Sequence, residues 1–239
     1  MTTPALARQV RGKGRMYEHP NTGELVPSVT NVIGVLNKPA LPRWAAKVVA
    51  EQAAAMKHSL PNLDDAEVID MLKGSPWRQS GRAADRGTTI HAYLECRMLG
   101  IDPPEISGEA ARYRKAADAW LADWQPEVVA TEQTVFGPDY AGTGDLWCTR
   151  DGQLAVVDFK SSKAIYAEAA LQLAALGRAT LRADGEPQPQ AKQGWVVRIG
   201  EKGYEAKQVA DLDANYEVFR ALIGAWHWQN GEDVYVAAV

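Results

Sequence analysis

Hydrophobic and polar residues alternate along much of residues 127–160, and this period of two predicts β-strands. Residues 128–135 give one strand, and residues 141–160 give two more around Asp151-Gly152. An Asp-Gly pair favours a two-residue hairpin turn, because such a turn needs positive φ at both central positions. This turn would place Arg150 opposite Gln153, which fixes the register of the hairpin.

Elsewhere the apolar residues recur at the spacing of an amphipathic helix. Hairpins are also expected over 16–26 and over 194–209, where the second turns at 200–203. The sequence thus predicts an α/β protein with one domain over 1–239, made of an N-terminal hairpin and helical extension (1–80) and a core (81–239). The expected helices are 41–57, 62–72, 88–98, 107–124, 166–180 and a last one that Asp211 caps.

The register of the central hairpin brings acidic residues together. Counting back from the turn puts Asp145 opposite Asp158 and Thr143 opposite Lys160. Two facing carboxylates on one sheet face repel each other unless a cation lies between them. The pattern therefore predicts a divalent-metal site with a lysine beside it.

Composition narrows the class of protein but does not choose the function. The chain has 239 residues and a formal net charge of −4, so nucleic acid would bind through a local basic groove rather than through overall charge. Residues 1–15 carry four basic side chains among small residues, and they predict a partly disordered tail, with a phosphate-contacting arm as the alternative. Two distant cysteines match no metal-cluster spacing. With no apolar run for a membrane span or a signal peptide, a cytoplasmic location is expected, in the host if a phage encodes the chain.

Four motifs follow one another in a familiar order: His91 in Gly-Thr-Thr-Ile-His, Asp145 in Gly-x-Gly-Asp, Val-Val-Asp-Phe-Lys ending at Lys160, and Gln172 in Gln-Leu. Together they resemble the RecB-type exonuclease branch of the PD-(D/E)xK nuclease superfamily, which includes phage-encoded members. The resemblance implies a restriction-endonuclease-like core, in which helices flank a central mixed β-sheet.

Two departures from that branch are visible. The branch often has a tyrosine four residues after the glutamine, where this chain has Leu176, and Tyr166 is a candidate substitute. Iron–sulfur relatives need four cysteines, so no iron–sulfur cluster is expected.

The resemblance also implies a set of metal ligands. Asp145 and Asp158 would bind Mg²⁺ or Mn²⁺ through their carboxylates, as hard cations prefer. The backbone carbonyl of Phe159 and the imidazole of His91 would complete the set. Solvated strand aspartates and a structural helix histidine are the alternatives.

Other polar residues have candidate roles around that metal. Lys160 would orient or deprotonate the attacking water, or stabilise charge on the phosphate, and a depressed pKa would suit the base role. Gln172 would bond near the site or to DNA. Glu132 could join the acidic patch, and Glu95 could orient His91, since it lies one helical turn away.

Arg82 and Arg86 precede the histidine and are candidate contacts to DNA phosphates, with a solvated loop as the alternative. The sequence thus predicts a Mg²⁺-dependent deoxyribonuclease, expected to be an exonuclease of phage or bacterial DNA recombination, repair or replication. A recombination or replication partner and an oligomer would fit this function. The alternatives are a non-catalytic nucleic-acid-binding or scaffold protein with the same fold, and a structure-specific endonuclease.

Overall fold

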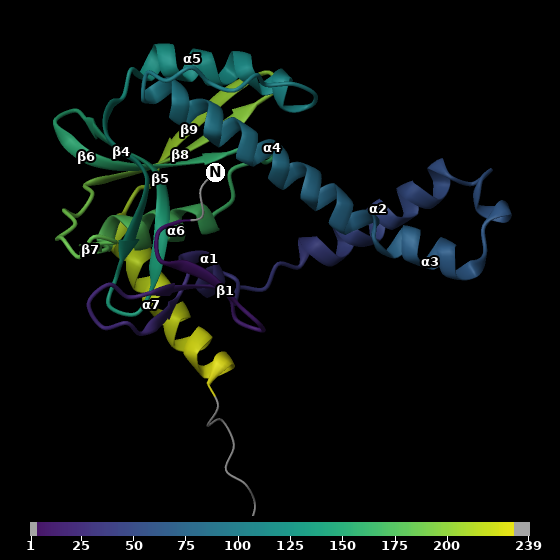
Figure 1. The fold of residues 1–239 in the computed structure, drawn as a ribbon, viewed down its shortest axis with the longest axis horizontal. Helices are drawn as coiled ribbons and strands as arrows, with labels where there is room; N and C mark the ends of the chain where they lie inside the picture. The colour runs from purple at the N-terminus through teal and green to yellow at the C-terminus, as the bar shows by residue number, and fades with distance from the viewer. Residues whose placement is uncertain (1–3, 232–239) are drawn as a thin grey trace, which may run out of the picture. The chain divides into compact units, whose positions relative to one another are not determined.

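The computed structural model describes residues 4–231, which form two compact units. One unit contains the described residues of Met1–Leu36 and Thr89–Val239, and the other is Asn37–Thr88. The first unit has a central mixed sheet flanked by helices, so the predicted α/β fold class is confirmed (Figure 1). Whether both units serve one nuclease domain stays a prediction.

The central sheet has six strands in the order β7-β4-β5-β6-β8-β9. β6 and β8 run parallel, and the other neighbouring pairs are antiparallel. The Asp151-Gly152 turn forms with positive φ at both residues, and Arg150 pairs with Gln153 as predicted. The strands are β4 (Glu127–Phe136), β5 (Ala141–Arg150), β6 (Gln153–Lys160), β7 (Leu181–Arg182), β8 (Gln193–Gly200) and β9 (Gly203–Gln208).

Helices cover both faces of this sheet (Figure 1). The C-terminal part of α4 and α5 pack on one face, where Leu146 and Val157 point, and α1, α6 and α7 pack on the other, where Trp147 and Val156 point. Because helices pack on both faces of the sheet, β5 and β6 have apolar side chains on both faces. The helices are α1 (Val29–Ile33), α4 (Ser75–Met98), α5 (Arg114–Trp124), α6 (Glu168–Arg178) and α7 (Leu212–Asn230), with a short 3₁₀ helix η2 (Ala110–Tyr113) before α5.

The basic N-terminal stretch is ordered, which corrects the expectation of a partly disordered tail. β1 (Ala7–Val10), β2 (Gly14–Glu18) and β3 (Leu25–Pro27) form an antiparallel three-stranded sheet. Buried Met16 and Tyr17 anchor this sheet to the first unit. Charge alone favoured a tail, whereas the two adjacent apolar residues of β2, Met16 and Tyr17, were the better signal.

The second unit is helical. It contains α2 (Ala40–Ala55), the 3₁₀ helix η1 (Leu60–Asn62), α3 (Asp65–Lys73) and the first part of α4. Residues 75–87, where a solvated loop was the alternative for Arg82 and Arg86, are helical and continue into the histidine helix. Their arginines, alanines and glutamine are good helix formers, and they outweigh the glycines. Among the described helices, none is both long and apolar enough to cross a membrane.

The strands β5 and β6 part at the point where the site lies. Their ladder runs from Arg150–Gln153 to Leu146–Val157 and stops there, while β5 stays paired with β4 and β6 with β8. The expected pairs Asp145–Asp158 and Thr143–Lys160 therefore do not form as ladder pairs. The reason is that Asp145 uses its side chain, rather than its backbone, to bond β6.

Candidate metal centre

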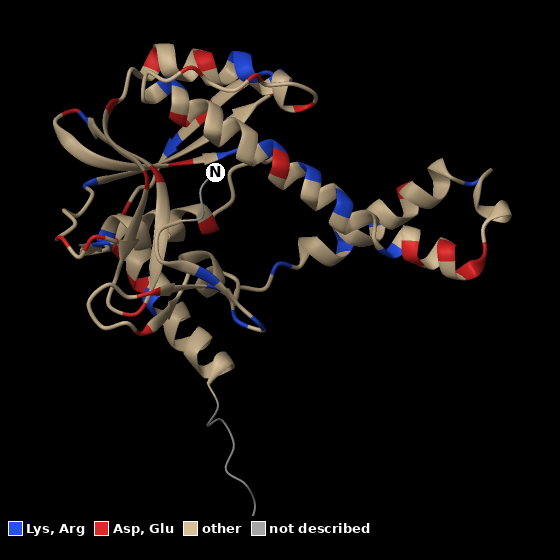
Figure 2. Cartoon of the chain, in the orientation of Figure 1, with Lys and Arg blue, Asp and Glu red and all other residues tan. Residues whose placement is uncertain are grey.

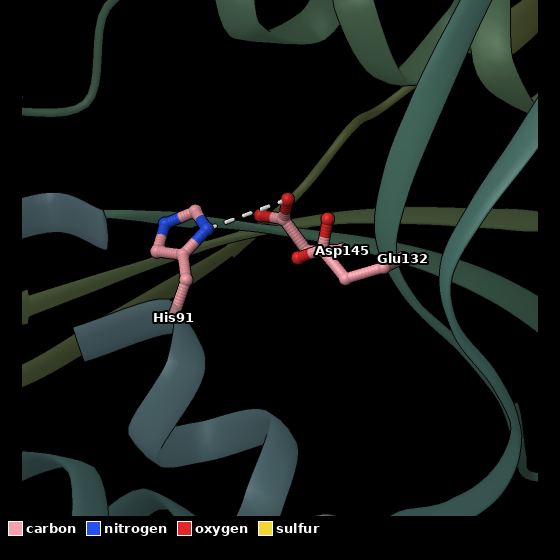
Figure 3. Close-up of side chains that lie close together, drawn as sticks. All are labelled: His91, Glu132 and Asp145. Carbon is pink, nitrogen blue, oxygen red and sulfur yellow. Dashed lines mark ion pairs between the residues drawn. The ribbon is translucent and has the colours of Figure 1, made fainter. Parts of the chain in front are cut away.

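Three side chains from three separate elements converge in the first unit. His91 comes from α4, Glu132 from β4 and Asp145 from β5 (Figure 3). One potential ligand atom of each lies within 4.8 Å of the others. All three side chains are half-buried.

Asp145 is fixed by the neighbouring strand. Its Oδ2 accepts a hydrogen bond of 2.7 Å from the backbone N–H of Phe159 on β6. Its Oδ1 lies 3.5 Å from Nδ1 of His91. The carboxylate therefore closes the gap where β5 and β6 part, and it still directs one oxygen toward the histidine.

His91 is also held by the backbone of Phe159. The ring Nε2 lies 2.9 Å from the Phe159 carbonyl oxygen. A carbonyl can only accept, so Nε2 carries the proton in this contact. The structure thus brings together three of the predicted ligand groups: the imidazole of His91, the carboxylate of Asp145 and the carbonyl of Phe159.

The second predicted aspartate lies in an adjacent network. Asp158 is 2% exposed, and Nζ of Lys160 donates a 2.7 Å hydrogen bond to its Oδ1. Lys160 also donates to Oε1 of Gln172 on α6, at 3.1 Å. Nζ is 2.7 Å from Oδ2 of Asp158 as well, but without hydrogen-bond geometry, and this buried oxygen has no other donor among the described residues.

The electrostatics of the cluster follow from burial and crowding. Burial raises the pKa of Glu132 to about 7, and the charge of Asp145 adds to the effect. Burial alone would lower the pKa of His91, but the Asp145 carboxylate outweighs it and raises that pKa to about 9. Burial likewise opposes ionisation of Asp145, yet its pKa stays below the ordinary value because of His91. The cluster therefore contains an imidazolium beside a carboxylate.

Lys160 differs from the sequence expectation. Burial would lower its pKa, but the carboxylates of Asp158 and Asp145 outweigh burial and raise the pKa above the ordinary value. Burial raises the pKa of Asp158 in turn, although the ammonium of Lys160 opposes this. The expected depressed lysine pKa is thus not found, and Lys160 is a cation in this network.

The first unit contains a cavity of about 510 Å³ beside these groups. The predicted residues His91, Glu132, Asp145, Asp158, Lys160 and Gln172 all contribute to its wall. The cavity is open enough for a ligand larger than a metal ion, because small-molecule sites typically begin near 300 Å³.

Four predicted residues are placed elsewhere. Glu95 accepts a 3.3 Å hydrogen bond from Oγ1 of Thr131. Tyr166 is 56% exposed and precedes α6 rather than lying on it. Arg82 and Arg86 belong to the part of α4 in the helical unit and are not among the cavity-lining residues. Their roles stay predictions.

The donor set fits a divalent cation. Carboxylates and a carbonyl oxygen are hard ligands that suit Mg²⁺ or Mn²⁺, and imidazole is tolerated by Mn²⁺. The buried Oδ2 of Asp158, which lacks a well-aligned donor, is a further oxygen available to a cation. Glu132 is part of this donor set, whereas the sequence analysis gave it only as a residue that could join the acidic patch.

The backbone explains how Glu132 reaches the cluster. Its φ is +47°, a left-handed conformation inside an otherwise extended strand. The neighbouring residues Thr131 and Gln133 pair normally with Leu146 and Gly144. Such strain in a non-glycine residue persists only where the surroundings enforce it. Sequence periodicity carries no signal for this feature.

Comparisons with known proteins give limited similarity. No protein-family model matches the chain, and no curated protein matches it either. Solved structures that match include an alkaline exonuclease (LHK-Exo) from Laribacter hongkongensis, with 12% identity, a TM-score of 0.36, and coverage of 62% of this chain and 80% of that one.

The same exonuclease in complex with dAMP matches at 12% identity and a TM-score of 0.36, over 59% of this chain and 77% of that one. The structure of SSO0001 matches at 13% identity and a TM-score of 0.29, over 47% of this chain. The match spans 57% of the SSO0001 chain, which is less than two thirds of its length.

Proposed function

We propose that the protein is a metal-dependent DNA nuclease that hydrolyses phosphodiester bonds. The observation that carries the proposal is the convergence of His91, Glu132 and Asp145 within 4.8 Å, in a cavity that Asp158 and Lys160 also line. Buried acidic groups that crowd together are unfavourable unless a cation neutralises them. The sequence motifs that carry the resemblance to RecB-type exonucleases contribute four of these five residues.

In this proposal Glu132, Asp145 and Asp158 hold Mg²⁺ or Mn²⁺ with help from His91 and the Phe159 carbonyl. When bound, the cation would supply Lewis-acid stabilisation of phosphate oxygens and would activate water.

Lys160 acts as a fixed positive charge. Its ammonium is positioned by Asp158 and Gln172, at 2.7 and 3.1 Å. A preorganised cation stabilises negative charge that develops on a phosphate more effectively than a solvated one does. Because its pKa is raised, we assign Lys160 to charge stabilisation and to orienting water, rather than to proton abstraction.

The test is degradation of DNA by protein stripped with EDTA and then supplied with Mg²⁺ or Mn²⁺. Glu132→Gln is the most informative variant. It removes a ligand charge, yet it costs little folding energy because the pKa of Glu132 is already about 7. Asp151→Asn, in the hairpin turn, is the matched control, since asparagine also adopts positive φ.

Wild type and Asp151→Asn should degrade DNA, and Glu132→Gln should be at least about 100-fold slower. If the wild type leaves DNA intact with both Mg²⁺ and Mn²⁺, the nuclease proposal is overturned. That result would favour a non-catalytic nucleic-acid-binding protein. Covalently closed circles separate the two nuclease types. An exonuclease leaves them intact, whereas an endonuclease opens them.

A further inference from the structure

The cavity has a basic side as well as an acidic one. Arg8 on β1 and Arg15 on β2 line the same cavity as His91, Asp145 and Lys160. Figure 2 shows Lys and Arg colour on the β1–β2 hairpin and Asp and Glu colour on the central sheet. Both arginine side chains are exposed, and neither belongs to the proposed metal ligands.

The backbone that carries Arg15 is held firmly. Its carbonyl accepts a 3.2 Å bond from the N–H of Ser28 and a 2.8 Å bond from Nδ2 of Asn31. The same Asn31 nitrogen donates to the Lys13 carbonyl at 2.7 Å. Gly14 lies between them with φ of +72°, and a Cβ there would be 3.0 Å from the Asn31 amide. These bonds therefore hold the backbone from which Arg15 projects.

A second set of bonds joins this hairpin to the catalytic strand. Tyr17 on β2 and Thr143 on β5 share a 3.3 Å hydrogen bond between their hydroxyls, and Thr143 bonds Thr134 on β4 at 3.0 Å. Thr143 lies two residues before Asp145, on the same strand. Tyr17 is 1% exposed. These hydrogen bonds thus connect the basic hairpin to the strand that carries the acidic cluster.

Arg8 forms an ion pair within the hairpin, but this ion pair is weak. Arg8 lies 3.8 Å from Glu18 on the neighbouring strand, and both side chains are about half exposed. Exposed ion pairs of this kind contribute little stability. A phosphate would be a better partner, because guanidinium groups bind phosphate oxygens with two parallel hydrogen bonds.

We infer that Arg8 and Arg15 bind the phosphate oxygens of a nucleic-acid strand in the cavity, at a phosphate next to the one that is hydrolysed. The inference rests on the proposed function for the identity of the ligand. It extends that proposal by assigning strand binding to the N-terminal hairpin and hydrolysis to the central sheet.

The test measures binding in EDTA, so it needs no cleavage. A fluorescently labelled oligonucleotide is titrated with wild type, Arg8→Ala and Arg15→Ala at several salt concentrations, and anisotropy gives the Kd. Arg11→Ala is the matched control, because Arg11 belongs to the same hairpin and does not line the cavity. Melting temperatures verify that each variant is folded. If Arg15→Ala does not fold, Arg15→Lys replaces it in the measurement, because lysine retains the charge but lacks the guanidinium group.

Each cavity variant should weaken binding about tenfold, the cost of one charged hydrogen bond. Each should also lower the slope of log affinity against log salt by about one. Arg11→Ala should match wild type. Cavity variants that bind like wild type, or that lose no more than Arg11→Ala, would overturn the inference.

Oligonucleotides with 5′-phosphate, 3′-phosphate or hydroxyl ends identify the source of the phosphate. If the effect vanishes with hydroxyl ends, the arginines bind a terminal phosphate. If it persists, they bind an internal phosphodiester, and either result supports the inference. The proposed function fails separately, through intact DNA with wild type and metal, and that outcome leaves this binding measurement valid.

Discussion

At the scale of single residues, Glu132 shows how a site can depend on an unfavourable backbone. Its left-handed φ of +47° interrupts a strand, and its carboxyl group faces Asp145 and His91. Non-glycine residues in this region cost about 1–3 kcal/mol each. The cluster thus stores strain and charge repulsion at the same position.

Glu132→Asn should therefore stabilise the EDTA-treated protein, by about 1 kcal/mol. Asparagine tolerates the left-handed region, and its neutral amide replaces a carboxyl group of the acidic cluster. Thermal unfolding measures the change, and Glu132→Gln is the control that removes the charge but retains the strain. An Asn variant no more stable than the Gln variant would show that the backbone is not strained.

The pH dependence of stability tests His91. Its pKa is raised to about 9 in the folded protein against an ordinary value of 6.5. The protonated imidazole therefore contributes roughly 3 kcal/mol of stability below pH 6.5, and this contribution is lost as pH rises through about 9.

Denaturant unfolding of EDTA-treated protein between pH 6 and pH 9.5 measures this loss. His91→Gln should flatten the decline, since it cannot be protonated. A metal ion competes with the proton, so stabilisation by added Mn²⁺ should increase over the same range. A wild-type stability that rises between pH 6.5 and pH 9 would contradict the assignment.

At the scale of elements, the Gly-Thr-Gly-Asp strand shows why its glycines matter. A Cβ at Gly142 would lie 2.8 Å from Leu176 on α6 and 2.9 Å from Val29 on α1. Both of those side chains are buried. The glycine therefore allows the two helices to approach β5, and α6 carries the Gln172 that contacts Lys160.

Gly142→Ala should destabilise the protein by about 1–3 kcal/mol, the usual cost of overpacking a core. Gly224→Ala on α7 is the control, because a Cβ there meets no atom of the described residues within 4 Å outside its own stretch of helix. It should be stabilising by up to about 1 kcal/mol, since alanine favours the helix. Equal melting temperatures for the two variants would argue against close packing at Gly142.

The sequence predicted the elements better than their ends. The turn at Asp151-Gly152 and the cap at Asp211 have local chemical causes, so both were predictable. The parting of β5 and β6 was not, because it depends on the Asp145 side chain bonding the Phe159 N–H. The convergence of His91 with the strands came from the resemblance, since a lone helix histidine indicates nothing by itself.

At the scale of the whole molecule, the two units differ in how much they bury. Within Asn37–Thr88 only Val48, Ser75 and Pro76 are buried, and Trp77 is 75% exposed. The unit that carries the sheet contains the large apolar clusters instead. Stability is therefore distributed unevenly along the chain.

Hydrogen exchange should report this difference. Amides of α2 and α3 should exchange at least about tenfold faster than those of β5 and β6, because few apolar contacts oppose local opening. Mass spectrometry of the intact protein after timed labelling, followed by digestion, resolves these segments. Similar protection in both units would show that the helical unit has stabilising contacts beyond its own burial.

Phe159 contacts both the buried core and the proposed metal ligands. Its ring is 2% exposed and packs edge-on against Trp120 at 4.8 Å, while its N–H and carbonyl hold Asp145 and His91. A change of volume at Trp120 would thus move the two peptide groups that flank Phe159, on which two proposed ligands depend. A redesign of this part of the core that optimises only packing would therefore displace both proposed ligands, even if the protein stays well folded.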